Sequence, residues 1–323
     1  MDILRRSQMN RNLISQVREE IAKVIVGKDE IIEAVLMAIL AKGHVLLEDI
    51  PGVGKTTLAL ALSKSLSLDY NRMQFTPDVL PADVTGFSMY SKKTDLFEYR
   101  EGAVMTNLFL ADEINRTSPK TQSALLEVME EGRVTVDGTT HDLPKPFFVI
   151  ATQNPIGSAG TQKLPESQLD RFMVKLSMGY PDVESEAVIL KEENQNRMDE
   201  VKSILTTDEI IVMQDEISSL YVADSIFSYI AEILKASRMS SLLHSGVSPR
   251  GGKSLLRMAR ARAYISNRDY VTPEDVIYVF DMVGAHRVTL SPEAKARGLT
   301  ASEILEEIIK SVELPNGVLE KGM

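Results

Sequence analysis

The chain has 323 residues, of which 44% are hydrophobic and 25% are charged, the composition of an ordinary globular protein of about two domains. Its net charge of −10 and its pI near 5.1 disfavour broad binding to the phosphate backbone of nucleic acids. The chain has no cysteine, which excludes a disulfide framework and thiolate chemistry.

The chain also lacks the usual targeting and membrane signals. The opening residues, MDILRRSQMNRNL, have neither the apolar core nor the small-residue cleavage site of a signal peptide. The longest apolar stretch, residues 34–41, is closed by Glu33 and Lys42 and is too short to span a bilayer. We therefore expect no membrane span and a cytoplasmic location.

The first predicted elements surround a glycine-rich turn. Apolar residues at helical spacing predict an amphipathic helix over residues 31–39, and residues 45–48 predict a short buried strand. The turn EDIPGVGKTT, residues 48–57, follows this strand, and a helix is predicted from about Lys55. A strand, glycine turn and helix in this order are typical of a phosphate site, because backbone N–H groups and the positive end of the helix face an anion.

Within this turn, Lys55 can reach the β- and γ-phosphates of a nucleotide, and the Thr56 hydroxyl can bind Mg²⁺. Asp49 stands where the pattern GxxxxGK[ST] has glycine; aspartate tolerates left-handed backbone better than most residues, so the turn can still form. We expect ATP to contact the whole turn, namely Asp49, Pro51, Gly52, Val53, Gly54, Lys55, Thr56 and Thr57.

Two further apolar runs predict strands, NLFLADE at residues 107–113 and PFFVIAT at residues 146–152. Because helical segments separate the runs, they indicate parallel strands of an α/β sheet. The first run ends in Asp112 and Glu113, two carboxylates that need a cation or water as partner at the end of a buried strand. We expect Asp112 to bind Mg²⁺ through water, and Glu113 to orient and activate the attacking water.

A helix and a hairpin are predicted between these two runs. Ser118 and Pro119 fit the first positions of a helix that ends at Gly132. Asp137 and Gly138 lie between alternating residues and predict a two-residue hairpin turn. We interpret this hairpin as an insertion into the parallel sheet.

The second part of the chain has a different character. The polar segment KEENQNRMDE, residues 191–200, predicts a linker or an exposed loop, and only helices are predicted beyond it. Thr206 and Glu209 form a capping box, and Thr272 with Pro273 opens another helix. A further helix has its apolar face at Ile226, Phe227, Ile230, Ile233 and Leu234.

The order of these motifs resembles that of the AAA+ ATPases, and specifically of the MoxR family. The resemblance extends over nearly the whole chain and is carried by VIVGKDEII, LLEDIPGVGKTTLA, QFTPDVLPADVTG, FLADEINRTSPKTQSALLEVMEEGRVTVDG, FFVIATQNP, LPESQLDRF and GVSPRGGKSLLRMARARA. It implies an α/β P-loop core, an αβα sandwich with a parallel sheet, over residues 1–182, with a pre-sensor-1 hairpin at about 132–145. A linker over residues 183–205 and an all-helical lid domain over residues 206–323 would follow.

The resemblance also implies roles that spacing alone does not. Val26 and Gly27 would lie against the adenine base, and Asn154 matches sensor 1, which helps to hold the attacking water. Arg171 matches the arginine finger, which completes the site of a neighbouring subunit and accelerates hydrolysis roughly 10³- to 10⁵-fold. Arg250 matches sensor 2, which reaches from the lid onto the phosphates.

Several residues keep an alternative interpretation. Arg116 is expected to face the subunit interface as well, whereas on sequence alone Arg171 fits a surface ion pair and Asn154 a turn. The histidines lack the spacing of metal ligands: His44, His141, His244 and His286. A basic stretch indicates a solvated or interface face, with nucleic-acid contact as the alternative: Lys253, Arg257, Arg260, Arg262 and Arg268.

The resemblance implies an ATPase that drives chaperone-like remodelling or maturation of protein complexes. It would act as a homo-oligomer, a hexameric ring or spiral, with a von Willebrand factor A-domain partner and protein clients. A nucleic-acid motor would share the ATP site, but the acidic charge disfavours it. The helical second domain and Arg171 disfavour a small-molecule kinase, and Glu113 disfavours a scaffold that binds nucleotide without turnover.

Overall fold

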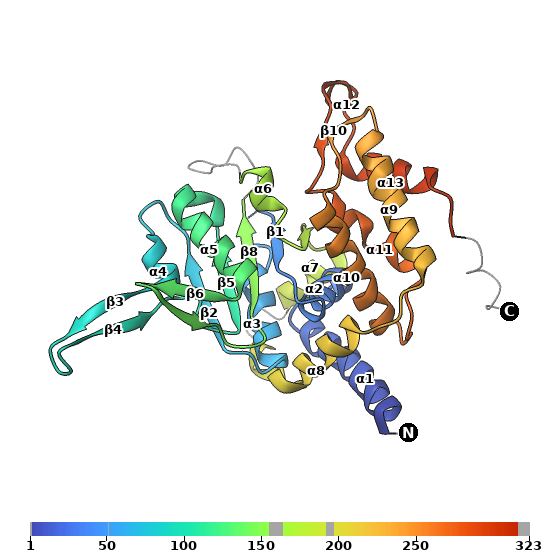
Figure 1. The fold of residues 1–323 in the computed structure, drawn as a ribbon. Coiled ribbons are helices and arrows are strands. Elements are labelled where there is room, and N and C mark those ends of the chain that lie inside the picture. Colours follow the sequence, from blue (N-terminus) through green and yellow to red (C-terminus); the bar gives the residue numbers. More distant parts are fainter. Residues whose placement is uncertain (1, 51, 155–163, 192–196, 316–323) are drawn as a thin grey trace.

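The computed structural model describes residues 2–50, 52–154, 164–191 and 197–315, which form an αβα core and a mainly helical second domain (Figure 1). The core sheet is parallel, with the strand order β2-β5-β8-β1-β9. Its strands are β1 (Val45–Glu48), β2 (Tyr70–Gln74), β5 (Leu108–Asp112), β8 (Phe148–Gln153) and β9 (Val174–Leu176). The three predicted strands and the fold class are confirmed, whereas the edge strands β2 and β9 were not predicted.

Side chains of the central strands alternate between two hydrophobic cores, one on each face of the sheet. On β5, Leu108 and Leu110 belong to the first core, and Phe109 and Ala111 belong to the second. Residues of α1 to α3 complete the first core, and residues of α4 and α5 complete the second. The helices of this domain are α1 (Asp2–Ala22), α2 (Asp29–Leu40), α3 (Lys55–Ser65), α4 (Pro81–Thr85), α5 (Pro119–Glu131) and α6 (Glu166–Leu169), with a 3-10 turn η1 (Ile114–Arg116).

Two antiparallel hairpins extend from this core. The predicted one pairs β6 (Arg133–Val136) with β7 (Thr139–Asp142), and both turn residues, Asp137 and Gly138, have the positive φ of a two-residue turn. The other pairs β3 (Gly86–Ser91) with β4 (Leu96–Glu101) and projects away from the helical domain (Figure 1). The sequence did not predict this hairpin, because nearly all of its side chains are partly or fully exposed. Without a buried face, apolar and polar residues do not alternate along its strands.

The predicted linker contains regular structure. Helix α7 (Val183–Lys191) and a 3-10 turn, η2 (Arg197–Glu200), lie within residues 183–205. Almost every side chain of α7 is partly or fully exposed, and only Ser185 is buried. The helix therefore lacks the one-sided apolar pattern by which an amphipathic helix is recognised.

The second domain contains the helices α8 (Thr207–Ser218), α9 (Asp224–Met239), α10 (Pro249–Ile265), α11 (Pro273–Gly284), α12 (Pro292–Ala296) and α13 (Ala301–Ser311). Thr206 is an N-cap with a capping box and Thr272 opens a helix, as predicted, and Thr272 also forms a capping box with Asp275. The expectation of helices only is wrong in one respect, since β10 (Leu243–Ser245) pairs with β11 (Thr289–Leu290). These strands are too short to produce a recognisable alternation.

The helical domain packs directly on the core. Buried residues of α10, Leu255 and Met258 among them, belong to the same hydrophobic cluster as those of α2. Arg262 forms an ion pair with Glu33 of α2, and Arg257 donates hydrogen bonds to the carbonyl groups that follow α2. Part of the basic stretch is thus engaged within the protein, which weakens the case for nucleic-acid contact.

In the described part of the chain, no helix combines the length and the apolar character that crossing a bilayer requires.

Candidate active site

The glycine-rich turn has the backbone shape that its sequence predicts. Gly52 and Gly54 have φ values of 90° and 94°, a left-handed region that side-chain-bearing residues rarely adopt. A Cβ atom at Gly52 would meet no atom within 4 Å, so glycine is needed there for backbone shape and not for close packing. Helix α3 starts at Lys55 without a side-chain cap, so its first N–H groups can face an anion. Pro51 lies outside the described residues.

Asp49 anchors the turn through hydrogen bonds of its carboxylate. It is 5% exposed, and its carboxylate accepts hydrogen bonds from Ser177 Oγ at 2.8 Å and from the backbone N–H groups of Met178 and Gly179 at 2.5 and 3.1 Å. Its carbonyl oxygen accepts a hydrogen bond from Lys55 Nζ at 2.8 Å. Asp49 is not among the positive-φ residues, so the expected left-handed backbone is not needed at this position. The residue ties the turn to the segment after β9.

A pocket of about 400 Å³ lies in front of this turn, at the carboxyl ends of β2, β5 and β8. We call it the phosphate pocket, and it is lined by Gly52, Gly54, Lys55, Thr56, Thr57, Arg72, Gln74, Asp112, Glu113 and Asn154. The structure thus brings together the predicted lysine, threonine, acidic pair and asparagine. They meet because the carboxyl ends of neighbouring parallel strands open on the same edge of a sheet.

Lys55 carries a poorly solvated charge in this pocket. It is 8% exposed, and burial lowers the pKa of its amine, although the nearby charges of Asp49, Asp112 and Glu113 act in the opposite direction. An anion placed before the turn would replace the lost solvation of this ammonium group. The pocket is therefore suited to bind phosphate.

Glu113 is held in a strained backbone conformation, and its carboxylate is fixed by hydrogen bonds. Its φ is 55°, and its N–H donates to Thr152 Oγ1 at 2.8 Å. Its carboxylate accepts hydrogen bonds from Asn154 Nδ2 at 2.9 Å and from Gln74 Nε2 and Arg116 Nη1, each at 2.7 Å. Burial raises the pKa of this carboxyl group, but the hydrogen bonds from Arg116 and Asn154 outweigh burial and lower the pKa below its usual value. Glu113 is therefore ionised at neutral pH and able to accept a hydrogen bond from water.

Three arrangements around these acids were not predicted. Arg116 forms an ion pair with Glu113 of its own chain, and its position at a subunit interface stays a prediction. Arg72 and Gln74 were not predicted as site residues, because they lie on the exposed edge strand β2. Arg72 lies just before the motif QFTPDVLPADVTG and Gln74 is its first residue, but polarity alone assigned them no role.

The residues of the phosphate pocket fit a magnesium ion that enters with the nucleotide. Asp112 accepts hydrogen bonds from Thr152 Oγ1 and from Arg72 Nη2, both at 2.7 Å, and Thr56 lines the same pocket. The described residues contain no group of three or more His, Cys, Asp or Glu side chains that could hold a metal ion. Mg²⁺ commonly takes one or two protein oxygens and completes its shell with phosphate and water. Thr56 and Asp112 are such a donor pair.

An apolar pocket of about 450 Å³ adjoins the phosphate pocket and shares Gly52, Gly54 and Thr57 with it. Its walls include Val26, Val53, Tyr180, Ile189 and Leu190. Val26 therefore lies where a base attached to the phosphates could reach it. Gly27 has another role: its φ is 71°, and a Cβ atom there would lie 2.2 Å from Ser185 Oγ.

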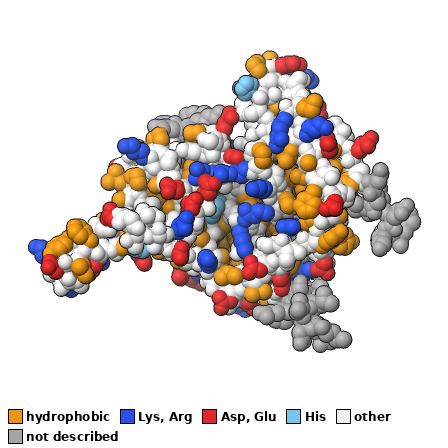
Figure 2. Space-filling view, viewed as in Figure 1, with side chains coloured by type: hydrophobic (Ala, Val, Ile, Leu, Met, Phe, Trp, Pro, Cys, Tyr) orange, Lys and Arg blue, Asp and Glu red, His pale blue; other side chains and the backbone are white. Residues whose placement is uncertain are grey.

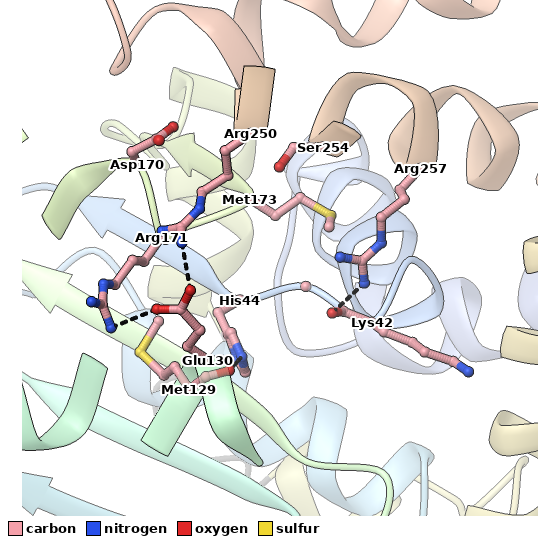
Figure 3. Close-up of a pocket in the computed structure, with 11 residues that line it drawn as sticks. Lys42, His44, Met129, Glu130, Asp170, Arg171, Met173, Arg250, Ser254 and Arg257 are labelled. Atoms are coloured by element: carbon pink, nitrogen blue, oxygen red, sulfur yellow. Dashed lines mark hydrogen bonds and ion pairs between the residues drawn. The ribbon is translucent and has the colours of Figure 1, made fainter. Parts of the chain in front are cut away.

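Arg171 and Arg250 lie together, but neither lines the phosphate pocket. They border a separate pocket of about 360 Å³, the arginine pocket, where α5, the segment after α6 and the start of α10 meet (Figure 3). Glu130 binds both of them: Arg171 Nη1 lies 2.9 Å from Oε2, and Arg250 Nη2 lies 2.5 Å from Oε1. Lys and Arg side chains gather at the centre of the face in Figure 2, where the core meets the helical domain.

Comparisons with known proteins agree with this geometry. The profile of the ATPase family associated with various cellular activities (AAA) matches residues 44–174, and that of the AAA lid domain matches residues 235–308. The YeaC protein of Bacillus subtilis (strain 168) is 50% identical over 304 residues, which cover 94% of this chain and 95% of YeaC. Chaperone MoxR1 of Mycobacterium tuberculosis is 37% identical over 314 residues, 94% of this chain and 83% of MoxR1. A crystal structure from Cytophaga hutchinsonii has a TM-score of 0.89 and 40% identity, and covers 96% of this chain and 97% of its own.

Proposed function

Because the chain belongs to the MoxR family of AAA+ ATPases, we propose that it uses Mg²⁺-dependent ATP hydrolysis for chaperone-like remodelling or maturation of protein complexes. The observation that carries the proposal is the convergence of Lys55, Thr56, Asp112, Glu113 and Asn154 on one pocket before a glycine turn. Each of these side chains has the chemistry that phosphoryl transfer to water requires.

The residues divide the work of hydrolysis. Backbone N–H groups of the turn and the Lys55 ammonium bind the phosphates, while Thr56 and Asp112 hold Mg²⁺, which offsets phosphate charge when it is bound. Glu113 orients the attacking water and accepts its proton, and the Asn154 amide holds Glu113 and the water in place. Oε2 of Glu113 accepts hydrogen bonds from both Gln74 and Arg116, whereas Oε1 accepts one from Asn154 and keeps a lone pair for the attacking water.

We propose that Arg171 and Arg250 act on the ATP of a neighbouring protomer. Their side chains are 31% and 44% exposed and lie outside the phosphate pocket of their own chain. Arg171 and Arg250, the residues predicted to be the arginine finger and sensor 2, thus lie side by side on one accessible face. The transferring phosphoryl group develops negative charge that these guanidinium groups can stabilise, in competition with Glu130.

This arrangement requires a homo-oligomer, which we propose to be a hexameric ring or spiral. A mixing experiment tests it. Arg171→Ala protomers retain their own phosphate pocket, and Lys55→Ala protomers retain their arginines, so a mixture of the two inactive variants is expected to regain ATPase activity. Arg297→Ala, which removes an exposed arginine paired with Glu293, is the control and is expected to be active alone. No recovery at any mixing ratio would contradict sharing of sites.

We further propose protein clients and a von Willebrand factor A-domain partner. Glu113→Gln protomers should keep ATP unhydrolysed and therefore stay bound to their clients for longer. Affinity capture with this variant, compared with Lys55→Ala, is expected to enrich such a partner. Its absence from the captured proteins would contradict the partner and leave the ATPase unaffected.

A further inference from the structure

The segment that carries Arg171 is held by an arginine of the helical domain. Arg287, between α11 and β11, directs its guanidinium group onto residues 170–173. Its Nε donates to Asp170 Oδ1 at 2.8 Å, Nη2 donates to the Phe172 carbonyl at 2.5 Å, and Nη1 donates to the Met173 carbonyl at 3.0 Å. The side chain of Arg287 is 1% exposed.

Two neighbours of the helical domain extend this contact. Ser248 Oγ, which caps α10, lies 3.1 Å from Asp170 Oδ2, and His286 Nε2 lies 3.1 Å from the Phe172 carbonyl oxygen. Arg250 follows Ser248 by two residues on the same helix. The helical domain therefore carries Arg250 itself and grips the segment that carries Arg171.

Stability alone is a poor explanation for this arrangement. Burial lowers the pKa of the Arg287 guanidinium, which is the sign of its desolvation, and the charge of Asp170 offsets this in part. Buried ion pairs often stabilise a fold no better than apolar residues of similar volume. What a guanidinium provides instead is a planar set of donors that fixes the orientation of the groups it binds.

We propose that Arg287 is a positioning residue that locks residues 170–173 to the helical domain, so that Arg171 and Arg250 reach the neighbouring protomer's ATP as one rigid pair. The inference rests on the proposed sharing of sites between protomers. Movement of the helical domain in one protomer would then set both arginines at the next protomer's phosphates.

Arg287→Gln removes the charge and most of the donors while the phosphate pocket of the same chain stays intact. We expect the affinity of this variant for ATP to be unchanged and its kcat to fall about 10²-fold, as expected when a catalytic group is displaced by about 1 Å. Mixed with Lys55→Ala protomers, which supply correctly placed arginines, Arg287→Gln protomers should regain activity. A protomer that is merely misfolded would not be rescued in this way.

Arg268→Gln is the matched control, because Arg268 also pairs with a carboxylate of the helical domain, Asp275, but makes no contact with residues 170–173. Its kcat should stay near that of the unmodified protein. Equal losses of kcat in Arg268→Gln and Arg287→Gln would show a general effect of weakening the helical domain and would overturn the inference.

The mixture of Arg171→Ala with Lys55→Ala separates the two proposals. If it regains activity and the Arg287→Gln mixture does not, the positioning role is wrong while the shared site stands; if neither recovers, the shared site itself is wrong. Should Arg287→Gln fail to fold, as judged by its thermal midpoint, Asp170→Asn replaces it. Asp170 is 22% exposed, and asparagine keeps its size but removes the charge that Arg287 binds. The same loss and rescue are expected, and their absence would overturn the inference.

Discussion

The phosphate pocket and the arginine pocket have opposite charge arrangements. In the phosphate pocket, Arg72 and Arg116 hold the acids Asp112 and Glu113. In the arginine pocket, the acid Glu130 holds the two arginines Arg171 and Arg250. The first pocket can bind nucleotide through Lys55, but its lining arginine, Arg72, is paired with Asp112; the second pocket has two partly exposed arginines but no phosphate turn. This difference supports our proposal that each pocket is half of an active site and that the halves meet between protomers.

Removal of the predicted arginine finger is expected to have the largest effect on hydrolysis. Arg171→Ala is expected to lower kcat roughly 10³- to 10⁵-fold, because positive charge at the transferring phosphoryl group is lost. ATP affinity should stay unchanged, since Arg171 does not line the phosphate pocket of its own chain. Steady-state hydrolysis and binding of a fluorescent ATP analogue measure the two effects. Weaker ATP binding with an unchanged kcat would indicate that Arg171 binds the ATP of its own chain, and would contradict its role as an arginine finger.

Substitution of Glu113 tests the role of the phosphate pocket. Glu113→Gln should lower kcat roughly 10²- to 10⁴-fold by removing the proton acceptor, while ATP still binds. Single-turnover hydrolysis separates this loss from slow product release. Near-normal turnover in this variant would exclude Glu113 from the mechanism.

The stability of the protein should depend on pH through His44, which lines the arginine pocket. His44 lies between the Met129 carbonyl and the Val149 N–H, and burial lowers its pKa to about 4. Between pH 6.5 and 4 the unfolded chain protonates His44 and the folded chain does not, so His44 contributes a fall of roughly 2 kcal/mol in the free energy of unfolding at pH 5. The buried His286, whose pKa is also lowered, acts in the same direction. Urea unfolding at pH 7 and pH 5 measures the change. His44→Gln should reduce the difference between the two pH values, and an unchanged difference would exclude His44 as its source.

The smallest expected effect concerns the anchor of the phosphate turn. Asp49→Ala leaves the Met178 and Gly179 N–H groups without their acceptor and should lower the free energy of unfolding by about 1–3 kcal/mol. Asp215→Ala, an exposed residue paired with Lys42, should change it by no more than about 0.5 kcal/mol. Equal effects of the two substitutions would show that Asp49 does not anchor the turn.

The two pockets also differ in how far the sequence predicts them. The phosphate pocket follows from local patterns, a glycine turn and apolar runs that end in polar residues, because parallel strands align those ends on one edge. Arg72 and Gln74 escaped prediction since their strand is exposed and lacks a buried face. Arg287 could not be predicted as the partner of residues 170–173, because that contact depends on how the helical domain packs on the core. The pair of Glu130 and Arg171 could not be predicted because it joins two segments of the core that lie far apart in the sequence.

If hydrolysis requires two protomers, as we propose, turnover per protomer should depend on protein concentration, and a dilution series measures this dependence. Mass photometry at each concentration gives the fraction of single protomers. Turnover is expected to fall in parallel with the assembled fraction, because a single protomer would have no arginine pair facing its ATP. Full turnover by single protomers would contradict the proposal.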